Sequence, residues 1–277
     1  MIENPKQTKR LTRRKRKSDE VVQSVRKRVS FLICGAQKAG TTALSDYLRK
    51  HPDLFIPDRK ELHYFDNEEL SWSRRGIFRR LNDGRYHWEF RQAPSHALLG
   101  EATPIYMYWE EAPRRIWEYN PEMKIIVILR NPIERAYSHW AMEKSRGNED
   151  LSFEEAIEQE QERCREQTPL QHRIYSYVDR GFYSAQIRRL WHLFGKESVL
   201  TLKQEELRDT PNDCLIKVWK HLGVESTSKV GPLESHLGYY ERKMTRQTHK
   251  KLTARFKNEI EELESMLGWD CSSWKVS

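Results

Sequence analysis

A short strand, a glycine-bounded loop and the start of a helix occupy residues 29–44, with the sequence Val-Ser-Phe-Leu-Ile-Cys-Gly-Ala-Gln-Lys-Ala-Gly-Thr-Thr-Ala-Leu. This arrangement presents backbone N–H groups and the positive end of a helix dipole to an anion. Gly35 and Gly40 have the spacing of the nucleotide-triphosphatase loop, G-x-x-x-x-G-K-[ST]. However, Thr41 stands where that loop has its lysine, and Lys38 lies inside the loop instead. We therefore expect a phosphate cradle that holds a different ligand.

Strands and helices alternate along the rest of the chain. The predicted strands span residues 29–34, 53–57, 98–103, 123–129 and 198–202. The predicted helices span residues 41–50, 113–119, 182–194, 211–222 and 245–267, with two more beginning at Asn131-Pro132 and at the capping box Ser152–Glu155. We expect short helices and loops in residues 67–97. The alternation predicts an α/β fold with a P-loop-like central parallel sheet, flanked by helices on both faces.

The basic charge of the chain is concentrated at its start. The net charge is +8, and residues 1–28 hold eleven of the 49 Lys and Arg residues but three of the 41 acidic ones. The remaining residues therefore carry 38 charges of each sign. Because residues 1–28 have few apolar side chains, they are expected to form a basic disordered tail, followed by a single domain over 29–277. The tail is either an arm for nucleic acid or an anionic surface, or a solvated extension without a specific partner.

Other features of composition bear on compartment and metal binding. No apolar run is long enough for a membrane span, and the N-terminus lacks the apolar core of a secretory signal. The four cysteines lie far apart, which is typical of reduced thiols and not of a disulfide framework or a zinc site. We expect a cytoplasmic protein without a metal site. The oligomeric state cannot be inferred from these features.

The residue after the 123–129 strand is unusual for a nucleotide triphosphatase. Such enzymes place an aspartate there to hold magnesium, whereas this chain has Arg130. An arginine removes a metal ligand and adds a fork that binds anions. Ser138 lies two helical turns further on, and its hydroxyl could share the same anion. The loop and Arg130 together predict a ligand with two separate phosphate-type groups and no metal, the alternative being a structural ion pair of Arg130.

Three segments resemble the heparan-sulfate-type branch of the sulfotransferases, which includes N-deacetylase/N-sulfotransferases and 3-O-sulfotransferases. They are residues 37–44 (QKAGTTAL), 60–66 (KELHYFD) and 129–138 (LRNPIERAYS). The resemblance covers about residues 29–274. These enzymes use 3′-phosphoadenosine 5′-phosphosulfate (PAPS) as donor and release 3′,5′-adenosine bisphosphate (PAP).

The resemblance implies a set of donor-binding residues. Lys38 would stabilise the charge that builds on the oxygen bridging phosphorus and sulfur, and Arg130 with Ser138 would hold the 3′-phosphate. Residues 237–244 resemble the loop that closes over the 3′-phosphate and adenine, with the register open between its tyrosines and its basic residues. The implied donor-binding residues are Gln37, Lys38, Ala39, Gly40, Thr41, Thr42, Arg130, Ser138, Tyr239, Arg242 and Lys243.

The resemblance also implies the residues that act on the acceptor. Glu61 matches the general base, which takes the proton from a hydroxyl or amine and contributes about 10²–10⁴-fold to the rate. His63 matches a residue that assists this base, so Lys38, Glu61 and His63 are the implied catalytic residues. Asp66 matches a residue on the acceptor side.

Residues 100–106 (GEATPIY) resemble the segment that lines the acceptor cleft, which implies that Thr103 and Tyr106 contact the acceptor. Glycan-modifying members usually have a lysine where this chain has Ala102. The departure argues against a highly anionic acceptor. The aromatic residues between 67 and 110 either shape the acceptor site or pack in the core.

The sequence thus favours a sulfotransferase that moves a sulfuryl group from PAPS to a hydroxyl or amine of a sugar or small polar natural product. Two alternatives remain. One is a nucleic-acid or anionic-surface binding protein that acts through the basic tail. The minor alternative is a small-molecule kinase, which needs magnesium and an acidic ligand where Arg130 stands.

Overall fold

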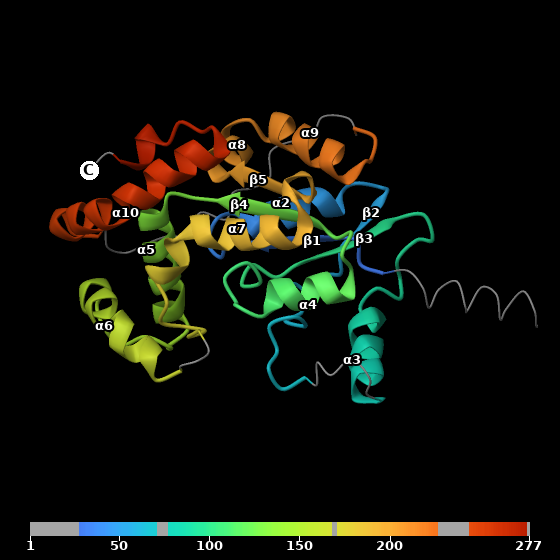
Figure 1. Ribbon diagram of the computed structural model, residues 1–277, viewed down its shortest axis with the longest axis horizontal. Coiled ribbons are helices and arrows are strands. Elements are labelled where there is room, and N and C mark those ends of the chain that lie inside the picture. The colour runs from blue at the N-terminus through green and yellow to red at the C-terminus, as the bar shows by residue number, and fades with distance from the viewer. Residues whose placement is uncertain (1–27, 71–76, 168–170, 227–243, 276–277) are drawn as a thin grey trace, which may run out of the picture.

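A five-stranded parallel sheet forms the centre of the computed structural model, which describes residues 28–70, 77–167, 171–226 and 244–275 (Figure 1). The strand order is β2-β3-β1-β4-β5, and every neighbouring pair is parallel. The strands are β1 (Phe31–Gly35), β2 (Leu54–Phe55), β3 (Leu98–Ala102), β4 (Lys124–Leu129) and β5 (Val199–Lys203). The predicted parallel α/β fold is confirmed.

Helices cover both faces of this sheet. In Figure 1, α4, α5, α7 and α10 pack together on one side, and α2, α8 and α9 lie on the other. The helices are α2 (Thr41–Arg49), α3 (Ile77–Trp88), α4 (Ala112–Tyr119), α5 (Pro132–Ser145), α6 (Phe153–Arg165), α7 (Tyr183–Phe194), α8 (Gln204–Asp209), α9 (Pro211–Leu222) and α10 (Arg246–Leu267), with 3₁₀ turns η1 (Asp179–Gly181), η2 (Lys196–Ser198) and η3 (Ser272–Trp274). None of the described helices has the length and apolar character needed to cross a membrane.

The neighbouring strands β1 and β4 determine where a ligand can bind. All five residues of β1 are buried, as are residues 125–129 of β4, which explains their continuous apolar sequences. Phe31 pairs with Lys124 and Gly35 with Val127, so both strands end at the same edge of the sheet. After β1 the chain continues to β2, on one side of the sheet, whereas after β4 it continues to β5, on the other side. Ligands bind where such connections diverge, beyond the carboxyl ends of the strands.

The aromatic residues of the 67–110 region pack mainly in the core. Tyr86, Phe90, Tyr106 and Trp109 are buried, whereas Trp88 is exposed. The rings of Tyr64 and Tyr86 stack with centroids 4.3 Å apart. For Tyr86, Phe90 and Tyr106 the structure favours core packing over the alternative of a surface that shapes acceptor choice. The region also contains α3, a helix of twelve residues where only short helices were expected.

Gly100, in β3, allows a close approach between neighbouring strands. A Cβ atom there would lie 2.1 Å from Cζ of Phe31, whose ring is fully buried. We predict that Gly100→Ala lowers the free energy of unfolding by about 1–3 kcal/mol, because the ring has no free space to move into. Urea denaturation measures this change.

Gly84→Ala is the matched control, since a Cβ atom at this helical position would meet nothing within 4 Å. Alanine also has the higher helix propensity, so this variant should be unchanged or stabilised by up to about 1 kcal/mol. Equal destabilisation of the two variants would contradict the packing argument.

Candidate active site

The loop between β1 and α2 is built to receive an anion. Gly40, the residue that precedes α2, has φ +100°, a left-handed conformation that glycine adopts without steric cost. No side chain caps this helix, so the N–H groups of its first turn are left for a ligand. At the start of the loop, Ala36 N–H donates to the carbonyl of Ile128 over 2.7 Å and ties the loop to β4.

Two predicted donor-binding cations meet at this loop. Arg130 Nη1 lies 3.5 Å from the carbonyl oxygen of Lys38, although 92 residues separate the two in sequence. Arg130 also forms an ion pair with Glu134 at 2.9 Å, which was the structural alternative for this residue. Burial lowers the pKa of Lys38, and the positive charges of Arg146, Lys60 and Arg130 lower it further. A bound anion would relieve this repulsion.

Other predicted donor-binding residues lie around the same loop. Thr41 is buried at the start of α2, and Ser138 is buried two turns into α5. The hydroxyl of Tyr183, at the start of α7, donates to the carbonyl of Arg130 over 3.0 Å and holds the end of β4. Tyr239, Arg242 and Lys243 lie outside the described residues.

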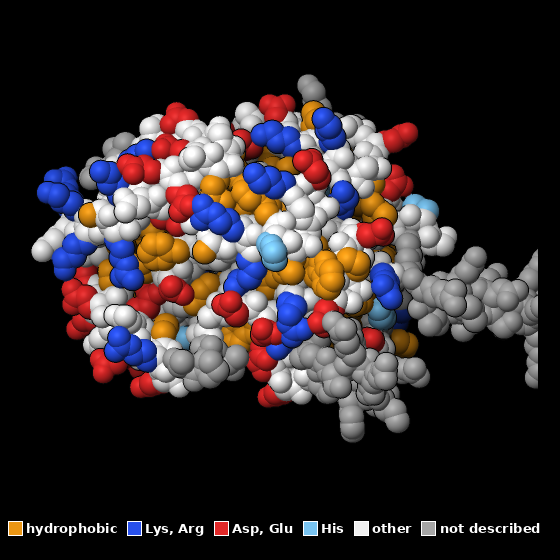
Figure 2. Space-filling model, in the orientation of Figure 1, with side chains coloured by type: hydrophobic (Ala, Val, Ile, Leu, Met, Phe, Trp, Pro, Cys, Tyr) orange, Lys and Arg blue, Asp and Glu red, His pale blue; other side chains and the backbone are white. Residues whose placement is uncertain are grey.

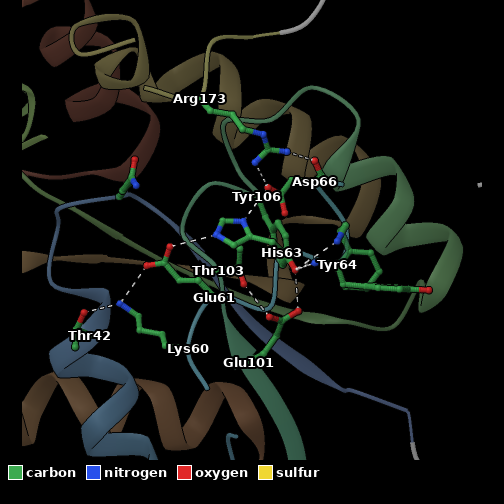
Figure 3. Close-up of polar contacts among 12 residues, drawn as sticks. Thr42, Lys60, Glu61, His63, Tyr64, Asp66, Glu101, Thr103, Tyr106 and Arg173 are labelled. Atoms are coloured by element: carbon green, nitrogen blue, oxygen red, sulfur yellow. Dashed lines mark hydrogen bonds and ion pairs between the residues drawn. The ribbon is translucent and has the colours of Figure 1, made fainter. Parts of the chain in front are cut away.

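The segment 60–66 lies beside the anion loop, at the carboxyl end of β3. Glu61 N–H donates to the carbonyl of Ala102, the last residue of β3, over 3.1 Å. Lys60 Nζ donates to Thr42 Oγ1 over 2.5 Å and lies 3.6 Å from Glu61 Oε1 (Figure 3). The structure therefore brings together two of the segments on which the sequence interpretation depends.

A carboxylate–imidazolium–carboxylate chain runs through this segment. His63 Nε2 lies 3.6 Å from Glu61 Oε2, and His63 Nδ1 lies 2.9 Å from Asp66 Oδ2 (Figure 3). Hydrogen bonds to Asp66 and Glu61 raise the pKa of His63 to about 9. Burial pushes the pKa of Glu61 up, but the hydrogen bond from His63 and the charge of Lys60 outweigh it, so the pKa falls below its usual value. At neutral pH, Glu61 is ionised and His63 is protonated.

Backbone strain is concentrated at the implied catalytic residues. Among the described residues, the non-glycine residues with positive φ are Lys38 (70°), Glu61 (59°) and His63 (52°). A left-handed conformation is unfavourable for such residues, and it persists only where the surroundings enforce it. These are the three residues for which the resemblance implies a catalytic role, which adds a conformational reason to regard them as functional.

Residues 100–106 form a hydrogen-bond network that holds residues 60–66. Glu101 is buried, and its carboxylate accepts hydrogen bonds from Thr103 (2.8 Å), Tyr86 (2.9 Å) and Tyr106 (3.0 Å). Burial raises the pKa of Glu101 to about 7 despite these hydrogen bonds. The Tyr106 hydroxyl in turn accepts from the N–H of Tyr64 over 3.0 Å.

The placement of three residues differs from the direct acceptor contact that the resemblance implied. Thr103, Tyr106 and Asp66 are each 0% exposed. The hydroxyls of Thr103 and Tyr106 are used on Glu101, and the Asp66 carboxylate holds His63. In this structure they hold residues 60–66 in place through hydrogen bonds to other protein groups.

Two arginines that the sequence interpretation did not include complete the site. Arg173 Nη1 donates to Asp66 Oδ2 over 2.5 Å, and its guanidinium stacks on Trp109 with 4.3 Å to the ring centroid. The buried Arg180 donates to the Gln37 side chain in the anion loop and, over 2.6 Å, to the carbonyl of Arg173.

These contacts form a closed series of polar interactions that begins at Thr42 and ends at Gln37, both next to the anion loop. Its members, in order, are Thr42, Lys60, Glu61, His63, Asp66, Arg173, Arg180 and Gln37. Arg173 and Arg180 lie in the connection between α6 and α7, where no periodicity marks them. Residues 180–183 (RGFY) resemble the sulfotransferases only loosely and are the one sequence signal in this connection.

A cavity of about 460 Å³ adjoins His63. Its walls come from residues 63–69, from Trp109 and from the connection that follows α6. It is lined by His63, Asn67, Glu68, Glu69, Trp109, Gln167, Gln171, His172 and Arg173. Within the described ranges, no group of three or more His, Cys, Asp or Glu side chains gathers so as to hold a metal ion.

Comparisons with known proteins relate this chain to sulfotransferases. A family model described as the sulfotransferase domain matches residues 28–267. The human bifunctional heparan sulfate N-deacetylase/N-sulfotransferase 3 is 31% identical over 221 residues, 76% of this chain and 24% of that protein. Mouse heparan sulfate glucosamine 3-O-sulfotransferase 6 is 39% identical over 118 residues, 42% of this chain and 30% of that protein. The chain thus spans about a quarter of the length of these relatives.

A solved structure covers nearly the whole chain. The sulfotransferase from Alicyclobacillus acidocaldarius superposes with a TM-score of 0.76 at 29% identity, covering 90% of this chain and 99% of that one.

The charge of His63 gives a testable pH dependence of stability. Because its pKa is raised from 6.5 to about 9 in the folded state, its interactions stabilise the fold fully below pH 6.5 and lose this effect as pH rises to about 9. We predict that His63→Gln is less stable than the parent chain below pH 6.5, and that the difference shrinks through this interval. Urea unfolding at several pH values measures the difference.

His192→Gln is the control, because His192 is exposed on α7. It should show no such pH-dependent difference. A constant difference for His63→Gln across the interval would argue against a protonated His63 between two carboxylates.

Proposed function

The chain belongs to the sulfotransferase domain family, and on this premise we propose that it transfers a sulfuryl group from PAPS to a hydroxyl or amine of a sugar or small polar acceptor. The observation that carries the proposal is that the Arg130 guanidinium contacts the Lys38 backbone at the uncapped start of α2, where burial and the Arg130 charge lower the pKa of the Lys38 ammonium. A nucleotide with two separate phosphate-type groups suits two cations at this position. Relatives named for heparan sulfate N-sulfation and glucosamine 3-O-sulfation support an amine and a hydroxyl as acceptor atoms.

The donor residues follow from this geometry. Residues 37–42 would bind the 5′-phosphosulfate through the N–H groups of the loop and the first turn of α2. Arg130, with Ser138 behind it, would hold the 3′-phosphate that distinguishes PAPS from ATP. Lys38, held in a left-handed conformation, would stabilise the charge that develops on the bridging oxygen. Sulfuryl transfer then needs no metal, because fixed ammonium and guanidinium groups provide the positive charge.

The acceptor step uses Glu61 as base. The acceptor oxygen or nitrogen forms a bond to sulfur while the bond from sulfur to the bridging oxygen breaks in line, and the electron pair of that bond stays with PAP. The acceptor proton passes to the Glu61 carboxylate. Since the pKa of Glu61 lies below its usual value, Glu61 is a weak base. It therefore takes the proton late, when bonding to sulfur has made the acceptor atom acidic.

His63 has a supporting role in this proposal. As an imidazolium at neutral pH it is not free to accept a proton, and its two N–H groups face Glu61 and Asp66. It holds the Glu61 carboxylate in orientation, and Asp66 and Arg173 hold His63 in turn. We also propose that residues 29–277 form a single sulfotransferase domain.

We predict that Arg130→Ala weakens PAP binding about 10–100-fold, because a charge-assisted contact to the 3′-phosphate is lost. Binding of 5′-AMP, which lacks that phosphate, should change much less. Calorimetry without magnesium compares the two nucleotides. Arg114→Ala, an exposed arginine on α4, is the control and should bind both as the parent chain does. Failure of the folded parent chain to bind PAP without magnesium would overturn the whole proposal.

We predict that Glu61→Gln reduces turnover by about 10²–10⁴-fold, because glutamine has the shape of the base but accepts no proton. PAP binding should stay within about twofold of the parent value, since the carboxylate does not contact the donor loop directly. Transfer from labelled PAPS measures turnover, with Glu111→Gln, immediately before α4, as a matched control. Unchanged turnover in Glu61→Gln would reject Glu61 as the base.

A further inference from the structure

The cavity beside His63 is rich in hydrogen-bonding groups and of small-molecule size. Its volume of about 460 Å³ lies within the range of pockets that enclose drug-sized ligands. The lining side chains are amides, imidazoles, carboxylates and one guanidinium, with Trp109 as the exception. Trp109 is 3% exposed and lies under Arg173. A polar ligand with many hydroxyls therefore suits the cavity better than an apolar one.

The positive charges that line the cavity are already paired. Arg173 donates to the carboxylate and the carbonyl of Asp66. His63 lies between Glu61 and Asp66. Among the described residues, the cavity thus offers an anion no cation that is free of a carboxylate partner.

The negative charges are less completely balanced. Glu68 pairs with Arg115 at 2.5 Å and accepts a hydrogen bond from Trp109 Nε1 over 2.6 Å. Glu69 is exposed and forms no ion pair with any residue in the described part of the chain. The Gln167 side chain, which also lines the cavity, likewise makes no hydrogen bond to a described residue. A carboxylate such as Glu69, which has no ion-pair partner among the described residues, favours a cationic ligand.

We propose that this cavity binds the acceptor and selects a compact polyhydroxylated amine, such as an amino sugar, over a polyanionic glycan. The inference rests on the proposed sulfotransferase function. The protonated amine pairs with Glu69. A hydroxyl of the same molecule lies beside His63, which lines the cavity and is 3.6 Å from Glu61, and this hydroxyl is sulfated. In this transfer the bond between the acceptor oxygen and sulfur forms, the bond between sulfur and the bridging oxygen breaks, PAP leaves with the electron pair, and the acceptor proton passes to Glu61.

The wider charge distribution supports this selection. Residues 29–277 carry equal numbers of basic and acidic side chains. Figure 2 shows the two signs interspersed over the visible face, without a broad field of basic residues. A polyanion binds through such a field, because its own charges must be neutralised along its length. Ala102, at the end of β3, adds no charge near Glu61.

Two disaccharides that differ only in N-acetylation, and one anionic glycan, test the proposal. They are the diamine chitobiose, its neutral N,N′-diacetyl derivative, and an anionic heparosan hexasaccharide. Transfer from labelled PAPS gives kcat/KM for each, and calorimetry with PAP present gives binding independently of turnover. We expect the diamine to exceed the diacetyl form by about three- to tenfold, with heparosan the poorest. The preference should fall as salt rises.

Glu69→Gln is the informative variant, and Glu122→Gln, on the exposed loop before β4, is its control. Glu69→Gln should bring the ratio of diamine to diacetyl form close to one and leave the diacetyl form unaffected, whereas Glu122→Gln should leave the ratio unchanged. A preference for heparosan, an unchanged ratio in Glu69→Gln, or failure of the diamine to bind beside PAP would overturn the inference. Failure of PAP to bind would contradict the proposed function, whereas PAP binding without the expected acceptor preference would contradict only this inference, so the two outcomes are distinguishable.

Discussion

The parallel pairing of β1 with β4 is the constraint on which the rest of the site depends. It brings two strands from distant parts of the chain to one edge, in register, so that the loop after β1 meets Arg130 after β4. Both strands are fully buried over most of their length, which fixes their positions through packing. Two cations that repel each other are thereby held beside one helix start. The favourable free energy of burying the two strands offsets the repulsion between Lys38 and Arg130, which persists until an anion binds.

A second unfavourable feature is a buried carboxyl group next to residues 60–66. Glu101 is a buried carboxyl group, and burial of such a group is unfavourable unless hydrogen bonds compensate. Three hydroxyls supply them, and one of these, from Tyr106, also holds the backbone at Tyr64. The network therefore fixes the position of residues 60–66, which include Glu61 and His63, relative to β3. Their left-handed conformations need such rigid support.

Much of the fold could be predicted from the sequence, because its signals are local. The apolar runs of β1 and β4, the capping box before α6 and the Asn-Pro start of α5 each lie within a few residues and read correctly. Lys38 and Arg130 were found because each departs from a known motif at a fixed position. The functional roles of these residues remain predictions that the experiments above address.

The parts that the sequence did not reveal depend on distant contacts. Arg173 meets Asp66 across 107 residues, and Arg180 meets Gln37 across 143, with no periodic pattern to mark either arginine. The burial of Thr103 and Tyr106 was also missed, since a hydroxyl looks the same in sequence whether it faces a ligand or a buried carboxyl group. Such roles depend on which neighbours the fold supplies.

The closed chain of polar contacts between Gln37 and Thr42 has a mechanical consequence. It is a ring in which the loop between β1 and α2 forms one arc, and residues 60–66 with Arg173 and Arg180 form the other. Because each residue of the ring contacts two others, the loss of one contact leaves the two arcs joined through the remaining ones. In the proposed transfer, the spacing of the two arcs would set the distance between the sulfur and the acceptor atom.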